Sequence, residues 1–68
     1  MGKVVLNGKE TDFQAGADLR AFLRERKIGT ENLILEWNGK ILTDRDSLET
    51  IVLKDGDAVN LFSMVGGG

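Results

Sequence analysis

The chain has 68 residues, of which 41% are hydrophobic and 29% are charged, and its formal net charge is −2. A chain of this length forms one small domain that buries only about 60% of its unfolded surface, so a deep enclosed active site is not expected. The composition is that of an ordinary folded protein and not of a disordered one.

Histidine and cysteine are both absent. Their absence removes the commonest general base, the thiol nucleophile and the usual ligands of zinc and iron–sulfur clusters, so bond-making chemistry must come from a partner or a cofactor. Without cysteine there is no disulfide framework, and the first residues resemble neither a signal peptide nor a membrane-spanning segment. We expect a cytoplasmic protein that does not contact membranes.

The first elements predicted in chain order are two strands and a hairpin turn. Residues 3–7 and 9–14 read as strands, and the Asn-Gly dipeptide at 7–8 suits the positive φ angles of a tight turn. Thr11 and Phe13 are expected on the core-facing side of the second strand.

A helix is predicted next. Asp18 is suited to cap its first turn, and the helix is expected to run to about Lys27, with Gly29 as its stop signal. The basic residues Arg20, Arg24, Arg26 and Lys27 lie mostly on this helix among acidic ones, which favours a solvated face and not a nucleic-acid site. The apolar face of the helix is formed by Leu19, Phe22 and Leu23.

A second hairpin follows, with strands at 33–37 and 40–42 and an Asn-Gly turn at 38–39. Residues 43–47 are polar, and we expect a loop or a short helical turn there. The residues expected to pin this loop to the core are Leu48, Ile51 and Val52.

The last predicted elements are a turn at 54–57 and a strand at 58–65. Val59 and Leu61 share one face of that strand, and Phe62 and Met64 share the other. A single helix after one hairpin must cover one sheet face. The sequence therefore predicts an α+β fold of the ubiquitin-like β-grasp type, with a mixed sheet of four to five strands, one helix packed across one face, and parallel first and last strands.

The chain ends in three glycines, residues 66–68, which directly follow the domain expected over residues 1–65. We interpret them as a flexible tail that carries a free carboxylate about 10 Å from the folded body. Because glycine has no Cβ, such a tail can enter a channel too narrow for other residues. Frayed termini often look similar, so the tail alone does not establish function.

Two acidic pairs could suggest chemistry. Asp55 and Asp57 flank a glycine but supply too few ligands for a calcium loop, so turn chemistry is the better interpretation. Asp44 and Asp46 are interpreted as solvated loop residues and not as an acid–base pair. No metal site is predicted.

Five segments follow one another along the chain: VLNGK at 5–9, AGADL at 15–19, EWNGKIL at 36–42, LKDGD at 53–57 and LFSMVGGG at 61–68. In the order, the spacing and the diglycine ending of these segments, the sequence resembles the ThiS family of sulfur carrier proteins of thiamine biosynthesis, a ubiquitin-like β-grasp family. Two departures are the loop at 43–48, which lacks the proline and aromatic residue common in relatives, and Trp37, which we read as a core filler with an exposed edge.

The resemblance implies a carrier that is not itself an enzyme. An adenylating enzyme of the ThiF type would use ATP and magnesium to activate the terminal carboxylate, and the carrier itself would bind no cofactor. Sulfur from a persulfide protein would then replace AMP, and the thiazole synthase ThiG would consume the resulting thiocarboxylate. In this scheme Gly68 carries the adenylate and then the sulfur, Gly66 and Gly67 thread the partner's channel, and the partner-binding residues are Phe62, Met64 and Val65.

Three alternatives remain open at this stage. The small subunit of molybdopterin synthase resembles this chain in fold and chemistry, but its relatives often carry prolines before the final glycines, and this chain has none. A ubiquitin-like modifier would instead form isopeptide bonds with target lysines. An interaction module with inert glycines would keep its function after Gly67 and Gly68 were deleted.

Overall fold

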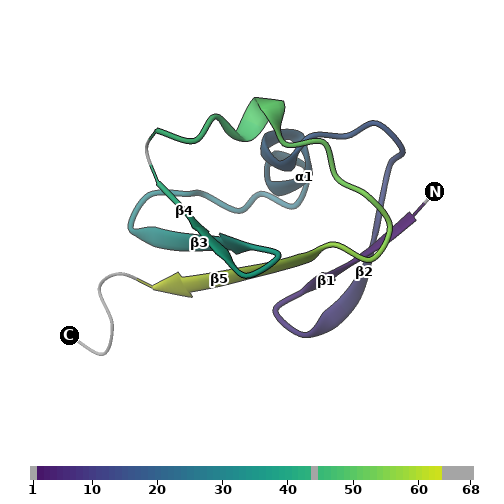
Figure 1. Ribbon diagram of the computed structural model, residues 1–68, viewed down its shortest axis with the longest axis horizontal. Coiled ribbons are helices and arrows are strands. Elements are labelled where there is room, and N and C mark those ends of the chain that lie inside the picture. Colours follow the sequence, from purple (N-terminus) through teal and green to yellow (C-terminus); the bar gives the residue numbers. More distant parts are fainter. Residues whose placement is uncertain (1, 44, 64–68) are drawn as a thin grey trace.

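The computed structural model describes residues 2–43 and 45–63 (Figure 1). Its elements, in chain order, are β1 (Gly2–Leu6), β2 (Lys9–Phe13), α1 (Leu19–Glu25), β3 (Leu33–Trp37), β4 (Lys40–Leu42), a 3-10 turn η1 (Leu48–Thr50) and β5 (Ala58–Ser63).

The five strands form one mixed sheet in the order β2-β1-β5-β3-β4. The first and last strands, β1 and β5, are paired in parallel, and the other neighbours are antiparallel. Figure 1 shows α1 and η1 together on one side of the sheet. The predicted α+β architecture, with one helix across one face and parallel first and last strands, is confirmed.

Both hairpins turn through Asn-Gly, as predicted. Asn7 and Gly8 have φ of 51° and 82°, and Asn38 and Gly39 have φ of 50° and 84°. Two-residue hairpin turns with positive φ at both positions match the right-handed twist of the strands, and Asn and Gly tolerate that conformation best. The turns therefore fix the register of both hairpins.

Helix α1 begins as predicted, because Asp18 Oδ1 accepts from Ala21 N over 2.8 Å. Its end differs from the prediction. The left-handed residue is Lys27, with φ of 58°, and Gly29 lies beyond the helix without positive φ. The amides of Lys27 and Ile28 donate to Arg24 O and Leu23 O, which is the bonding of a Schellman motif. The helix therefore ends at Glu25, two residues earlier than expected, and the left-handed residue that follows it is a lysine and not a glycine.

The core lies between α1 and the sheet. The loop prediction was partly wrong, because Val52 is 49% exposed and Leu53 is buried in its place. Leu53 N donates to Ala17 O, which ties this residue to the segment before α1. Leu48 is buried and Ile51 packs against the core, as expected. The buried core consists of Val4, Phe13, Leu19, Phe22, Leu23, Leu35, Leu42, Leu48, Leu53 and Val59.

Candidate docking face and the strand that leads to the tail

The tail predicted at residues 66–68, including Gly66, Gly67 and Gly68, lies outside the described residues. Met64 and Val65 lie outside them as well. Among the predicted site residues, Phe62 is the one whose surroundings the structure describes.

β5 is the strand from which the C-terminal segment continues. It pairs with β1 on one side and with β3 on the other. Its residues alternate between the two faces of the sheet, so Val59 and Leu61 point toward α1, where Val59 is fully buried and Leu61 packs against the core. Ala58, Asn60 and Phe62 therefore point to the opposite face.

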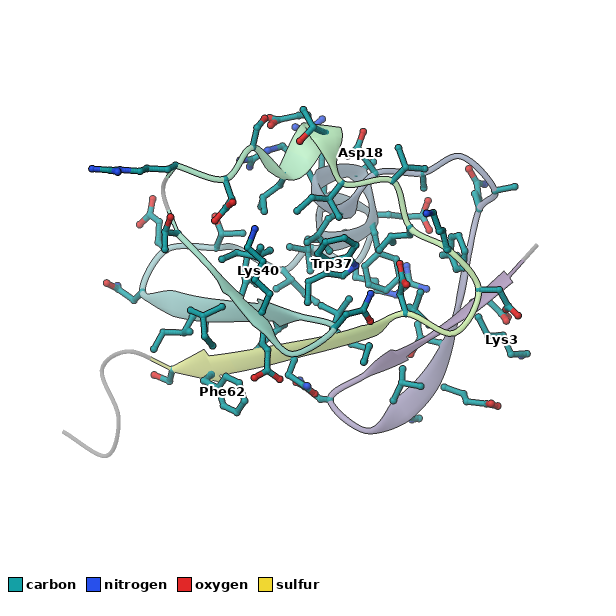
Figure 2. All side chains as sticks on the ribbon, in the orientation of Figure 1. Lys3, Asp18, Trp37, Lys40 and Phe62 are labelled. Atoms are coloured by element: carbon teal, nitrogen blue, oxygen red, sulfur yellow. The ribbon has the colours of Figure 1, made fainter. Side chains whose placement is uncertain are left out.

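Phe62 is 49% exposed. Figure 2 shows it on the side of the sheet opposite α1, whereas Trp37 lies on the helix side. The prediction that an apolar side chain next to the tail would be exposed is thus confirmed for Phe62. Trp37 is only partly buried against the core, which agrees with its interpretation as a core filler with an exposed edge.

Two further apolar side chains lie on the same uncovered face. Ile34 on β3 is the register partner of Phe62, and Ile41 on β4 is the partner of Glu36, one outward position away from Ile34. Ile41 is 50% exposed. Register partners on one face lie close enough for their side chains to touch. We call Ile34, Ile41 and Phe62 the open-face patch.

A polar pair borders this patch. Asn60 Nδ2 donates to Glu36 Oε1 over 2.9 Å, and the two residues face each other across β5 and β3. The bond keeps the carboxylate of Glu36 beside the apolar side chains. The open-face patch therefore offers apolar contact area with one oriented acceptor at its edge.

The sequence analysis did not single out Ile34 or Ile41. Both carried a signal, since Ile34 falls between two core-facing leucines and Ile41 precedes the buried Leu42. An apolar residue at an outward position of a strand that has only one covered face predicts either a second layer or a docking surface. Knowledge that the helix covers one face was needed to choose between them.

The acidic residues have structural roles. Asp46 Oδ2 accepts from Thr43 N over 2.8 Å, and this backbone bond lowers the pKa of the Asp46 carboxyl. Asp55 Oδ1 accepts from Lys3 N over 2.8 Å and so joins the last turn to β1. Neither carboxylate is arranged for acid–base catalysis, and Asp44 lies outside the described residues.

Asp57 is the buried acidic residue of the described chain, with 8% exposure. Burial raises the pKa of its carboxyl, but hydrogen bonds from Asn38 Nδ2, Lys54 N and Trp37 Nε1 outweigh burial and hold the pKa below its usual value. The carboxylate therefore closes the 54–57 turn and ties it to the second hairpin. This confirms the interpretation of residues 54–57 as a turn.

Within residues 2–43 and 45–63, no group of three or more acidic side chains is placed to hold a metal ion. An open hollow of about 540 Å³ lies beside the C-terminal half of α1, and its lining includes Leu23, Ile28, Arg24 and Lys27. None of the described helices is long and apolar enough to cross a membrane.

The sheet order, the single covering helix and the parallel central strands define a ubiquitin-like β-grasp protein. Comparison with known proteins narrows this class. The family model described as "ThiS family" matches residues 4–68. The chain belongs to the ThiS family.

Two relatives extend the comparison. The crystal structure of the thiamine biosynthesis protein ThiS from Geobacter metallireducens superposes with a TM-score of 0.80 at 29% identity, covering 97% of this chain and 99% of that one. A thiazole synthase of Paramagnetospirillum magneticum is 30% identical over 66 residues, which are 97% of this chain. This chain spans only 20% of the length of that relative.

Proposed function

We propose that the protein is a sulfur carrier of thiamine biosynthesis whose C-terminal Gly68 is adenylated and then converted to a thiocarboxylate. The observation that carries the proposal is the placement of β5. This central strand is hydrogen-bonded on both sides, leads directly into the segment that ends in glycines, and exposes Phe62 beside it. Membership of the ThiS family supports the same conclusion.

In this proposal, the activating enzyme and the persulfide protein make and break the bonds at the carboxylate of Gly68. A ThiF-like enzyme with ATP and magnesium joins the Gly68 carboxylate to AMP and releases pyrophosphate. The terminal sulfur of a persulfide protein attacks the activated carbonyl carbon, and AMP leaves. The carrier is then joined to the persulfide protein through an acyl disulfide. A thiol attacks the inner sulfur of this group and forms a disulfide with it, and the S–S bond to the carrier breaks, which releases the thiocarboxylate. The carrier contributes the carboxylate and the surface that brings it to each enzyme, in the cytoplasm where ATP is available.

A thiazole synthase of the ThiG type is the proposed acceptor of the sulfur. The relative from Paramagnetospirillum magneticum, which bears the name thiazole synthase and includes a segment similar to this chain, supports this pairing. In the proposal, the open-face patch docks on the activating enzyme while Gly66 and Gly67 occupy its channel. Met64 and Val65 are proposed to contact the activating enzyme as well.

The first test is pyrophosphate exchange with a ThiF-like enzyme, comparing the unmodified protein with Gly67→Ala. A Cβ in a channel that fits only backbone prevents the carboxylate from reaching ATP, so we expect exchange to fall by at least about a hundredfold. The matched control is Gly29→Ala, because Gly29 lies in a surface loop where an added Cβ meets no atom within 4 Å. Equal exchange by Gly67→Ala and the unmodified protein would contradict the channel role.

A further inference from the structure

The two Asn-Gly turns do more than close the hairpins, because both asparagines also bind β5. Asn7 lies in the β1–β2 turn and Asn38 in the β3–β4 turn. Since β1 and β3 are the two neighbours of β5, the turns hold this strand from opposite sides. In each asparagine, the backbone amide donates a hydrogen bond to β5 and the side-chain oxygen accepts one from β5.

Asn7 holds β5 near the end that leads to the tail. Asn7 N donates to Val59 O over 2.9 Å, and Asn7 Oδ1 accepts from Leu61 N over 2.8 Å. The β1–β5 pairing ends at Leu6 and Val59. The side-chain oxygen of Asn7 therefore takes the place of the carbonyl that β1 would offer if it continued, and it extends the hold on β5 to Leu61.

Asn38 does the same at the beginning of β5. Asn38 N donates to Ala58 O over 2.9 Å, and Asn38 Oδ1 accepts from Ala58 N over 2.8 Å. Asn38 Nδ2 also donates to Asp57 Oδ1 over 3.0 Å. Asn38 thus holds the beginning of β5, and Asn7 holds the side of β5 that faces β1 as far as Leu61, while pairing with β3 continues to Ser63.

The turn conformation alone does not explain asparagine at position 7. Its φ of 51° suits glycine at least as well, and Gly-Gly also forms two-residue hairpin turns. What glycine lacks is the acceptor for Leu61 N. Asn32 provides the contrast, because its φ is 60° but its side chain makes no hydrogen bond to the residues that the structure describes.

We propose that Asn7 is a positioning residue for the C-terminal tail. By binding Leu61 N it completes the two-sided hold on β5 two residues before the strand ends at Ser63, so that Gly68, seven residues beyond Leu61, reaches the activating enzyme's ATP in productive register. A small displacement of a reacting group costs a large factor in rate. Phe62 and Ser63 pair with β3, so loss of the Asn7 bond loosens the last part of β5 on the side that faces β1. This inference rests on the function proposed above.

The test compares Asn7→Gly, Asn7→Asp and Asn32→Gly in pyrophosphate exchange with a ThiF-like enzyme. Asn7→Gly keeps the turn conformation and loses the acceptor, whereas Asn7→Asp keeps both, since aspartate also tolerates positive φ. Asn32→Gly makes the same substitution at another residue with positive φ, whose side chain accepts no hydrogen bond from β5. Amide hydrogen exchange of Leu61 is measured in parallel on all of the proteins.

For Asn7→Gly we expect kcat at saturating carrier to fall by about fivefold, the factor that corresponds to one hydrogen bond, while KM changes little because the open-face patch is intact. Protection of the Leu61 amide falls with it. Asn7→Asp restores both quantities, and Asn32→Gly changes neither. Simple loss of stability would act differently, because it lowers the concentration of folded carrier and raises KM without lowering kcat.

An unchanged kcat in Asn7→Gly, or a loss of kcat in Asn7→Asp as large as in Asn7→Gly, would overturn the positioning role and leave the proposed function standing. Absence of exchange with the unmodified protein would contradict the proposed function itself, and the positioning role with it. Unchanged Leu61 protection in Asn7→Gly would show that the bond does not hold β5, which also overturns the inference.

Discussion

The two faces of the sheet differ in what they bury. The face toward α1 carries Val4, Leu35 and Val59 in a closed core, whereas the opposite face has no covering layer in the described chain and exposes Phe62 and Ile41. Both faces are built from the same strands, with alternating residues. The difference indicates that the covered face maintains the fold and that the open face is available for recognition.

The largest expected effect on stability comes from the covered face. Leu19 on α1 is fully buried, so Leu19→Ala removes apolar contacts and leaves a cavity, with an expected cost of about 3 kcal/mol in the free energy of unfolding. Urea denaturation measures this cost. At a temperature where the variant is still folded, its binding to partners should be unchanged. Weakened binding by the folded variant would contradict the assignment of stability to the covered face and of recognition to the open face.

Phe62→Ala is expected to show the reverse pattern. Because Phe62 is half exposed, its loss should lower the free energy of unfolding by no more than about 1 kcal/mol. Binding to the activating enzyme should weaken by about tenfold or more, since a central aromatic anchor carries much of the binding energy of an interface. Calorimetric titration gives the affinity.

Val52→Ala is the matched control for Phe62→Ala. Val52 is equally exposed, at 49%, but lies between η1 and β5 and not on the open face. The control should leave partner affinity unchanged. If Phe62→Ala lowered stability strongly and affinity little, Phe62 would belong to the fold and not to the docking surface.

The carboxyl group of Asp57 is expected to make the free energy of unfolding depend on pH. Its pKa is lower in the folded protein than in the unfolded chain, so its contribution to stability is present above about pH 4 and is lost as the pH falls through the folded pKa. Asp57→Asn should cost about 1–2 kcal/mol at pH 7, because the charge-assisted bonds from Asn38, Lys54 and Trp37 are weakened. Unfolding measured from pH 7 to pH 2 should show a smaller pH dependence in the variant. An identical pH dependence would remove Asp57 from this role.

The smallest expected change is a gain in stability. Lys27 is held in the left-handed conformation at the end of α1, so Lys27→Gly should stabilise the protein by about 0.5–1 kcal/mol. Arg24→Gly, in the last turn of the helix, should instead destabilise it by about 1 kcal/mol. Thermal melting distinguishes the two. Destabilisation by Lys27→Gly would show that the lysine side chain contributes more than its backbone strain removes.

Local chemistry made part of this fold predictable. The Asn-Gly turns, the Asp18 cap and the turn at 54–57 depend on a few adjacent residues, and the structure confirms all of them. The parallel pairing of β1 and β5 followed from the single helix that connects the first hairpin to the rest of the sheet.

One error arose where no periodic pattern guides the chain. The segment 43–53 has neither helical nor strand periodicity, so the sequence did not show that Leu53 and not Val52 faces the core. The hold of Asn7 on Leu61 spans 54 residues of sequence and is invisible to local patterns. The same holds for Ile34 and Phe62, which become one surface only when β3 pairs with β5.

The most direct test of the account is the intact mass of the protein isolated from cells that must make their own thiamine. The account predicts a fraction heavier by about 16 Da, the exchange of one oxygen for one sulfur, on the peptide that ends in Gly68. A variant lacking Gly67 and Gly68 should show no such species. An unmodified mass under thiamine demand, or an isopeptide conjugate in place of the thiocarboxylate, would contradict the sulfur carrier function.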